Sequence, residues 1–287
     1  MRLLFRGAAM AAVTAMLVGC ASSKAPVTAE APPRAPAAVQ VYAAGSLREA
    51  LTLIASDYEA RTGQAVALTF GASGLLRERI EKGEAAQVFA SADMDHPQRL
   101  AAEHGWQAPT VLVRNALCAL TSDQVNAAPA TLLGTLLRPA IRVGTSTPKA
   151  DPSGDYAWAL FRKADEIQPG AYAVLDAKAL KLTGGADSPK PPPGRGTYAW
   201  IMEQRRADVF LTYCTNAMAA QKEVPWLKVV QLPPVLQVGA AYGLTVRTTA
   251  QPSAVQFAQA LMAPPAQAVF RRFGFGPPPS GLEPPQR

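Results

Sequence analysis

The sequence contains only two histidines and three cysteines. His96 and His104 fall in a segment that reads as an exposed helix, so a histidine-based metal cage or nucleophilic site is hard to build. Gly194-Arg195-Gly196 is too short for a dinucleotide fingerprint, and the glycine spacing around Ser73 is wrong for a nucleophile elbow. We therefore predict that the protein is not an enzyme.

The sequence also lacks a concentrated basic surface. Its formal net charge is +7, from 28 lysines and arginines against 21 acidic residues, and loss of Arg2 and Arg6 with an N-terminal signal would lower it to +5. The basic residues are scattered and not interleaved with aromatic residues, which argues against nucleic acid as a partner. A slightly positive surface helps to attract a small anion. Past the N-terminal region, no apolar run reaches membrane length.

The N-terminus has the features of a bacterial export signal. Two arginines precede an apolar stretch, residues 8–18, which is too short to span a bilayer comfortably. It ends in Leu17-Val18-Gly19-Cys20, which resembles the lipobox of bacterial lipoproteins, whose cysteine is acylated. The resemblance implies a signal peptide over residues 1–19 and a lipid anchor at Cys20, on the periplasmic side of a bacterial membrane. An uncleaved anchor helix and a soluble secreted protein with an incidental cysteine are the alternatives.

The segment after Cys20 differs in composition from the rest of the chain. Residues 20–38 are rich in alanine, serine and proline and cannot bury enough apolar surface to fold, so we predict a disordered tether. The remainder is long enough for two compact domains. It holds Cys118 and Cys214, an even pair in an oxidising compartment. We predict a disulfide between them, with two buried free thiols as the alternative.

Strand and helix patterns alternate through the rest of the chain. The β-rich runs 39–42, 65–70 and 87–90 are each followed by a helical pattern, and a second series of elements includes the strand 209–213. Repeated strand–turn–helix units predict a parallel or mixed sheet with helices packed on its faces.

Several helices are predicted to begin with a small or hydroxyl residue directly after a strand. Ser46, with Glu49 three residues on, matches a capping box, and Ser73 and Ser153 stand in similar places. The first N–H groups of a helix lack internal partners, and the helix dipole adds partial positive charge. Several helix starts that meet at the carboxyl ends of strands can therefore hold a dianion without a cationic side chain. Taken alone, each serine is more simply a helix cap.

Three loops, in order, resemble the ligand loops of the periplasmic molybdate-binding proteins. They are Val41-Tyr42-Ala43-Ala44-Gly45-Ser46-Leu47, Phe70-Gly71-Ala72-Ser73-Gly74 and Ala90-Ser91-Ala92-Asp93, and residues 269–275 are similar to that family's closing helix. The match covers nearly all of the chain beyond the tether. Together the three loops are specific for the family, although each alone is weak. The resemblance implies an α/β fold, namely a two-lobed periplasmic binding protein of type II. Each lobe would be a mixed sheet flanked by helices, with the ligand cleft between the lobes.

The resemblance also implies lobe limits and ligand residues. The first lobe would span residues 39–116 plus about 238–287, and the second 117–237. The ligand residues would be Ser46, Ser73 and the backbone N–H of Ala92 from the first lobe, and Ser153 and Tyr213 from the second.

Two departures from the family pattern leave the ligand open. The segment 145–152 is longer than the family's loop, and Arg195 stands where the family offers a backbone N–H. An inward Arg195 side chain would add a charge and a planar donor fork, which suits sulfate, phosphate-like or carboxylate ligands as well as molybdate. We expect it to turn outward and contribute its backbone. A further alternative is a secreted hydrolase with Ser73 or Ser153 as nucleophile, for which no base can be placed.

The function implied by the resemblance is capture of molybdate or tungstate for the membrane permease of an ABC importer. Closure would occur by rotation of the lobes about strands near Ala116 and Val238. We expect a monomer that binds a small oxyanion, without a cofactor and without a metal cation held by protein side chains.

Overall fold

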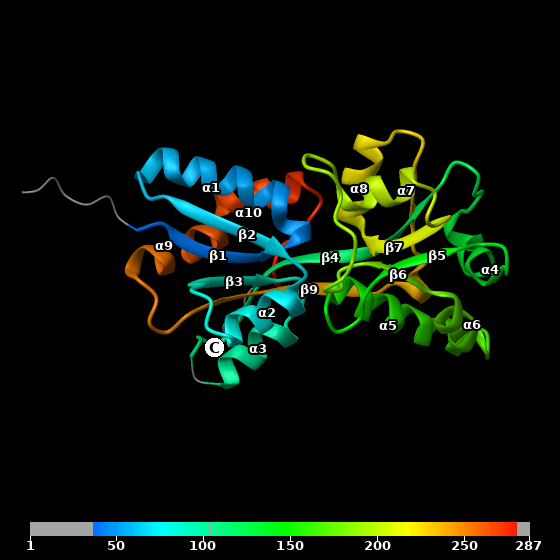
Figure 1. The fold of residues 1–287 in the computed structure, drawn as a ribbon, viewed down its shortest axis with the longest axis horizontal. Helices are drawn as coiled ribbons and strands as arrows, with labels where there is room; N and C mark the ends of the chain where they lie inside the picture. Colours follow the sequence, from blue (N-terminus) through cyan, green and yellow to red (C-terminus); the bar gives the residue numbers. More distant parts are fainter. Residues whose placement is uncertain (1–36, 104, 280–287) are drawn as a thin grey trace, which may run out of the picture. The chain divides into compact units, whose positions relative to one another are not determined.

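Figure 1 shows the computed structural model of the chain, which describes residues 37–103 and 105–279. These residues belong to one compact unit, Pro36–Arg287. The predicted signal peptide, Cys20 and nearly all of the predicted tether lie outside the described residues, as does His104. Among the residues that are described, no helix is both long and apolar enough to cross a membrane.

One sheet is built from both ends of the described chain, and we call it, with its helices, the first lobe. In sheet order its strands are β2 (Val66–Gly71), β1 (Val39–Ala44), β3 (Val88–Ser91), β9 (Gly239–Val246) and the first part of β4 (Thr110–Thr121). The first three are parallel, and β9 runs antiparallel to β3 and β4. Its helices are α1 (Arg48–Thr62), α2 (Ser73–Glu81), α3 (Asp95–Ala102), α9 (Pro252–Met262) and α10 (Pro264–Arg272). In Figure 1, α1 and α10 lie on one side of this sheet and α2 and α3 on the other.

The second lobe is built around the remainder of β4. Its other strands are β7 (Val209–Tyr213), β8 (Lys228–Gln231), β5 (Val143–Ser146) and β6 (Leu180–Thr183). Its helices are α4 (Leu132–Leu137), α5 (Pro152–Ile167), α6 (Ala171–Lys178), α7 (Thr197–Glu203) and α8 (Cys214–Glu223). Short 3-10 turns cover Gly45–Leu47, Pro129–Thr131 and Pro234–Leu236.

A single strand, β4, belongs to both lobes. Its residues up to Ala116 pair with β9, whereas from Leu117 onward they pair with β7 and then also with β8. The change of strand partner lies between residues 116 and 117. The α/β class with two lobes, each a mixed sheet flanked by helices, is confirmed.

The second lobe carries a disulfide. Cys118 lies on β4 opposite Thr212 of β7, two residues before Cys214 at the start of α8. The two sulfurs are 2.02 Å apart, and 96 residues separate the cysteines in sequence. The strand pairing therefore explains how two cysteines so distant in sequence become neighbours.

Two local predictions about the first lobe are wrong. The Ser46 side chain does not cap α1, because a 3-10 turn precedes that helix and the Ser46 hydroxyl is hydrogen-bonded to the Tyr242 hydroxyl at 2.9 Å. His96 is not on an exposed helix face, since only 6% of it is exposed where α3 packs against α2, β3 and β9. The predicted stop at Gly63 is correct, and this glycine ends α1 in the left-handed conformation with φ 70°.

Candidate functional site

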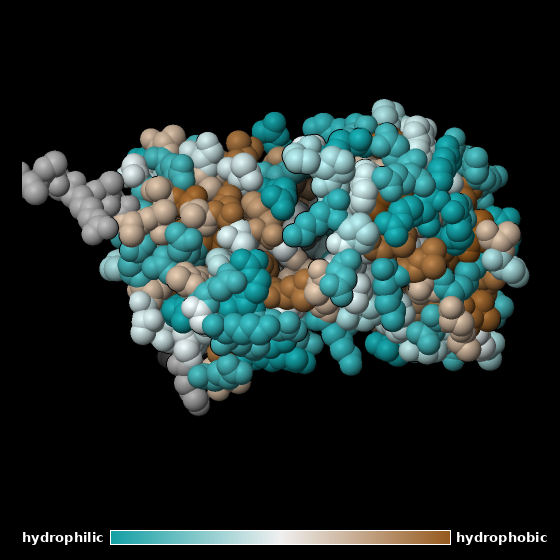
Figure 2. Space-filling view, in the orientation of Figure 1, coloured by the Kyte–Doolittle hydropathy of each residue, from teal (hydrophilic) through white to brown (hydrophobic). Residues whose placement is uncertain are grey.

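A cavity of about 890 Å³ lies where the carboxyl ends of β1, β2 and β3 meet loops of the second lobe. Parallel strands end at one edge of a sheet, so the loops after these three neighbouring strands come together. Figure 2 shows mainly hydrophilic residues over α2 on one side and over α7 and α8 on the other, with the surface hollowed between them. Five predicted ligand residues line this cavity: Ser46, Ser73, Ala92, Arg195 and Tyr213.

Hydrogen bonds connect three of these residues directly across the two lobes. The backbone N–H of Ala92 donates to Ser73 Oγ at 3.0 Å, and the Tyr213 hydroxyl donates to the Ala92 carbonyl at 3.1 Å. Ser73 and Ala92 come from the first lobe, whereas Tyr213 ends β7 in the second. The Ser73 hydroxyl accepts in this bond, so its own proton is free to point into the cavity.

A second group of buried polar side chains supports this arrangement and was not predicted from the sequence. Tyr242 on β9 is hydrogen-bonded to Ser46 at 2.9 Å and accepts from Asn115 Nδ2 at 3.1 Å. Asn115 also donates to Thr215 Oγ1 at 2.9 Å, which links β4 to α8. The Tyr242 ring lies 5.4 Å from that of Tyr213. In the sequence, Tyr242 looks like any strand aromatic, and no local pattern marks it.

The tyrosines of the site are neutral hydrogen-bonding groups. Burial raises the pKa of Tyr213 and of Tyr242 well above the usual range, and it raises the pKa of Tyr198, which lines the same cavity, to about 12. Each hydroxyl therefore keeps its proton at neutral pH. Tyr198 and Tyr213, which line the cavity, can donate to an anion without adding charge to the site.

The structure does not bring Ser153 to the cavity as the resemblance implied. Ser153 is fully buried, and its backbone N–H donates to Asp151 Oδ1 at 3.1 Å. Asp151 is the N-cap of α5, and Pro152 occupies the first helical position. Among the described residues, the Ser153 hydroxyl has no hydrogen-bond partner. The Ser153 N–H, which was expected to donate to the ligand, therefore donates to the Asp151 carboxylate instead.

Asp151 itself lines the cavity and was missed by the sequence reasoning. Burial raises its pKa from 3.8 to about 6, while the Ser153 N–H and the Ser146 hydroxyl act in the opposite direction. The sequence did contain a signal, because Asp-Pro-Ser-Gly is a typical helix start with the aspartate as N-cap.

The Arg195 guanidinium is occupied by two glutamates, although the residue lines the cavity. Its Nη2 lies 2.7 Å from a Glu203 carboxylate oxygen, and its Nε donates to Glu223. Its backbone N–H donates to the Pro192 carbonyl at 3.1 Å, and Gly196 N–H donates to Glu223 at 2.9 Å. Both the side chain and the backbone of Arg195 therefore bind groups of the second lobe itself.

The lobes also touch directly at one edge of the cavity. The Gly74 N–H, in the first turn of α2, donates to the Ala150 carbonyl at 2.9 Å. A Cβ atom at Gly74 would lie 2.3 Å from the Lys149 carbonyl oxygen, so only glycine permits this approach.

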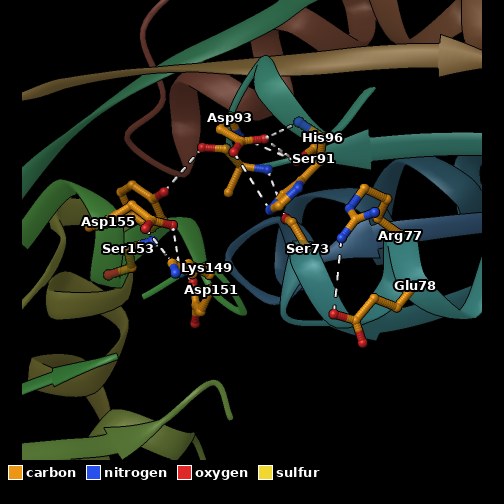
Figure 3. Close-up of polar contacts among 12 residues, drawn as sticks. Ser73, Arg77, Glu78, Ser91, Asp93, His96, Lys149, Asp151, Ser153 and Asp155 are labelled. Atoms are coloured by element: carbon orange, nitrogen blue, oxygen red, sulfur yellow. Dashed lines mark hydrogen bonds and ion pairs between the residues drawn. The ribbon is translucent and has the colours of Figure 1, made fainter. Parts of the chain in front are cut away.

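Figure 3 shows three carboxylates near this contact between the lobes: Asp93, Asp151 and Asp155. In the first lobe, Asp93 accepts from the Ser91 hydroxyl at 2.7 Å and lies 3.7 Å from His96 Nε2. In the second lobe, Asp155 accepts from the Lys149 N–H at 3.0 Å. Burial raises the pKa of Asp93 and of Asp155, and it lowers the pKa of His96. Among the described residues, no three acidic, histidine or cysteine side chains are placed to share a metal ion.

Comparison with known proteins identifies relatives over nearly the whole described region. The family model for bacterial extracellular solute-binding proteins matches residues 39–276. An uncharacterised protein of Pasteurella multocida is 36% identical over 211 residues, which are 73% of this chain and 87% of the relative. YvgL of Bacillus subtilis, assigned by name to the ABC transporter substrate-binding lipoproteins, is 25% identical over 93% of this chain and 96% of its own.

Solved structures with the same fold carry different ligands in their names. The periplasmic molybdate-binding protein of Azotobacter vinelandii is 19% identical, with a TM-score of 0.65, over 84% of this chain and 99% of that one. The sulfate-binding protein SubI of Mycobacterium tuberculosis is 19% identical, with a TM-score of 0.68, over 84% and 87%. Iron-bound HitA of Pseudomonas aeruginosa is 14% identical, with a TM-score of 0.60, over 88% and 90%. At these identities the likeness shows the fold alone.

Proposed function

This chain belongs to the family of bacterial extracellular solute-binding proteins, and we propose that its solute is a small tetrahedral oxyanion, molybdate or tungstate. The observation that carries this proposal is the convergence of Ser46, Ser73, Ala92 and Tyr213 on one cavity between the lobes. The molybdate-binding protein of Azotobacter vinelandii has the same fold. The captured anion would be delivered to the membrane permease of an ABC importer.

The chemistry of the cavity suits an anion that has lost its water shell. The hydroxyls of Ser46, Ser73 and Tyr213 are neutral donors that can replace water molecules around the oxygens. Ser73 also begins α2, where the helix dipole favours negative charge. In the structure the Tyr213 hydroxyl donates to the Ala92 carbonyl, and a bound anion would compete for that proton. Cavity size would then separate molybdate from sulfate, since the two share charge and shape.

A different small anion is the alternative ligand within the same function. Arg195 lines the cavity, and a guanidinium turned inward would suit sulfate, phosphate-like or carboxylate groups. Its pairing with Glu203 and Glu223 argues against this, because turning inward would leave two carboxylates without their cation.

A serine hydrolase is disfavoured by the geometry. Ser73 Oγ accepts from the Ala92 N–H, and Ser153 is buried and is not among the residues that line the cavity. Within residues 37–103 and 105–279, neither hydroxyl is hydrogen-bonded to a histidine, a carboxylate or a lysine that could act as its general base.

Lipid anchoring at Cys20, on the periplasmic side of a bacterial membrane, is part of the proposal. The lipobox-like sequence and the name of the Bacillus subtilis relative support it. Metabolic labelling with a fatty acid should mark the wild-type chain and not Cys20→Ala. Equal labelling of both would contradict the anchor.

The ligand is tested by a panel of oxyanions. We expect molybdate and tungstate to raise the melting temperature of the mature protein, and calorimetric titration to show tight binding with no response to sulfate. A shift with another anion, and none with molybdate or tungstate, would overturn the ligand and leave the family assignment intact.

A further inference from the structure

The cavity proposed for a dianion contains a carboxylate. Asp151 lines it together with the donors of both lobes, and its Oδ1 accepts the Ser153 N–H at 3.1 Å. A carboxylate and a dianion in contact inside a poorly hydrated cavity repel each other strongly. An anion that binds next to Asp151 therefore requires either that Asp151 leaves or that a proton lies between the two groups.

Asp151 is held in place from several sides. Its backbone N–H donates to the Thr147 carbonyl at 2.9 Å, and Thr147 in turn donates to the Thr183 carbonyl at 2.9 Å. The next residue, Gly184, approaches so closely that a Cβ atom there would lie 2.5 Å from Asp151 Cβ. The cap bond to Ser153 closes the start of α5. Removal of this side chain from the cavity would therefore break the beginning of a helix.

The groups around Asp151 do not neutralise it. Asp155, further along α5, and Asp93, from the first lobe, are acidic and disfavour its ionisation. Tyr198 on α7, Tyr213 on β7 and Tyr242 on β9 face the same region and are neutral. The groups that favour the ionised form are the Ser146 hydroxyl of β5 and the Ser153 N–H, both uncharged. Ionised Asp151 is therefore balanced by dipoles alone.

We propose that Asp151 contacts the bound anion and makes its capture proton-coupled. A fully ionised tetrahedral dianion would bind together with one proton, which forms a hydrogen bond from an Asp151 oxygen to an anion oxygen. This rests on the proposed function, because it concerns the same cavity. Asp151 would then be a specificity-determining residue: protonated it donates to the anion, and ionised it repels it.

The raised pKa of Asp151 determines how the affinity for the anion should depend on pH. Burial raises the pKa of Asp151 to about 6 in the free protein, and a dianion beside it raises that pKa further. Asp151 is mostly protonated, and the protein therefore competent to bind, below about pH 6. The protonated fraction falls about tenfold for each pH unit above that value. Affinity should therefore be constant below about pH 6 and fall about tenfold per unit at higher pH, until the pKa of the complex is reached.

The test is calorimetric titration of molybdate into the wild-type protein at about pH 6.5, 7.5 and 8.5, in pairs of buffers with different ionisation enthalpies. We expect uptake of about one proton per anion at the two higher pH values. Asp151→Asn keeps the Oδ1 that caps α5 and gives the site a permanent N–H donor. It should bind without proton uptake, with an affinity independent of pH, and more tightly than the wild type at about pH 8.5.

Asp155→Asn is the matched control. It makes the same change of charge on the same helix, at a carboxylate that accepts the Lys149 N–H. It should retain the proton uptake of the wild type. Equal loss of proton uptake in both variants would show that the general field, and not contact with Asp151, controls binding.

The role of Asp151 and the proposed ligand would be contradicted by different results. Tight binding of molybdate to the wild type with no proton uptake and no pH dependence would overturn the role of Asp151 and leave the proposed function standing. No heat with molybdate or tungstate at any pH would overturn the proposed ligand, and this inference with it. Should Asp151→Asn fail to fold, as judged by circular dichroism, the wild-type proton count still decides.

Discussion

Removal of the Tyr213 hydroxyl should weaken both the ligand site and the contact between lobes. In Tyr213→Phe the ring stays in place beside Tyr242, but the Ala92 carbonyl loses its donor at 3.1 Å. A buried acceptor left without a partner destabilises a fold by about 1–3 kcal/mol. A lost hydrogen bond to a charged ligand costs about 1.5–3 kcal/mol, which is about 10- to 150-fold in dissociation constant.

Two measurements separate these effects. Urea denaturation gives the free energy of unfolding, and calorimetric titration with molybdate gives the dissociation constant. Tyr242→Phe is the matched control, because it loses hydrogen bonds to Ser46 and Asn115 while Tyr242 is not among the cavity-lining residues. We expect a similar loss of stability in the control and a much smaller loss of affinity. If Tyr213→Phe loses stability but binds molybdate like the wild type, the hydroxyl is structural and our assignment of it as a ligand group is wrong.

Two other changes test the framework around the site. Replacement of Cys118 and Cys214 by serine opens a loop with a sequence separation of 96 residues. Urea denaturation should show a free energy of unfolding lower by about 2–5 kcal/mol. An unchanged value would show that the disulfide does not stabilise the fold. Gly74→Ala places a Cβ 2.8 Å from the Ala150 carbonyl and should lower the melting temperature, whereas Gly134→Ala, at an open position in α4, should leave it unchanged or raise it slightly. Equal effects of the two alanines would refute the close contact between lobes.

The convergence of the site could be predicted because it follows from strand order. Ser46, Ser73 and Ala92 each follow a strand, and β1 pairs in parallel with both β2 and β3. Any sequence that places small residues after three such strands brings them to one edge. Tyr213 followed from the family resemblance, since it also ends a strand, on the other lobe.

The remaining details depend on contacts between distant segments. Ser46 fits a capping box, but its hydroxyl is bound to Tyr242, which is 196 residues away in sequence. His96 appeared exposed because the helical pattern of α3 does not reveal which face packs against β9. Ser153 was assigned a ligand role by resemblance. The sequence Asp-Pro-Ser-Gly is itself typical of a helix start with aspartate as N-cap, and in the structure Asp151 accepts the Ser153 N–H. The sequence analysis placed Ser153 at this helix start and did not consider Asp151, which is the N-cap.

The strand β9 has a consequence for the order of assembly. It inserts between β3 and β4, so the first sheet stays incomplete until residues 239–246 arrive. Contacts this distant in sequence form late, because the intervening chain must first be brought together. We therefore expect the first sheet to be completed only after most of the chain has been synthesised.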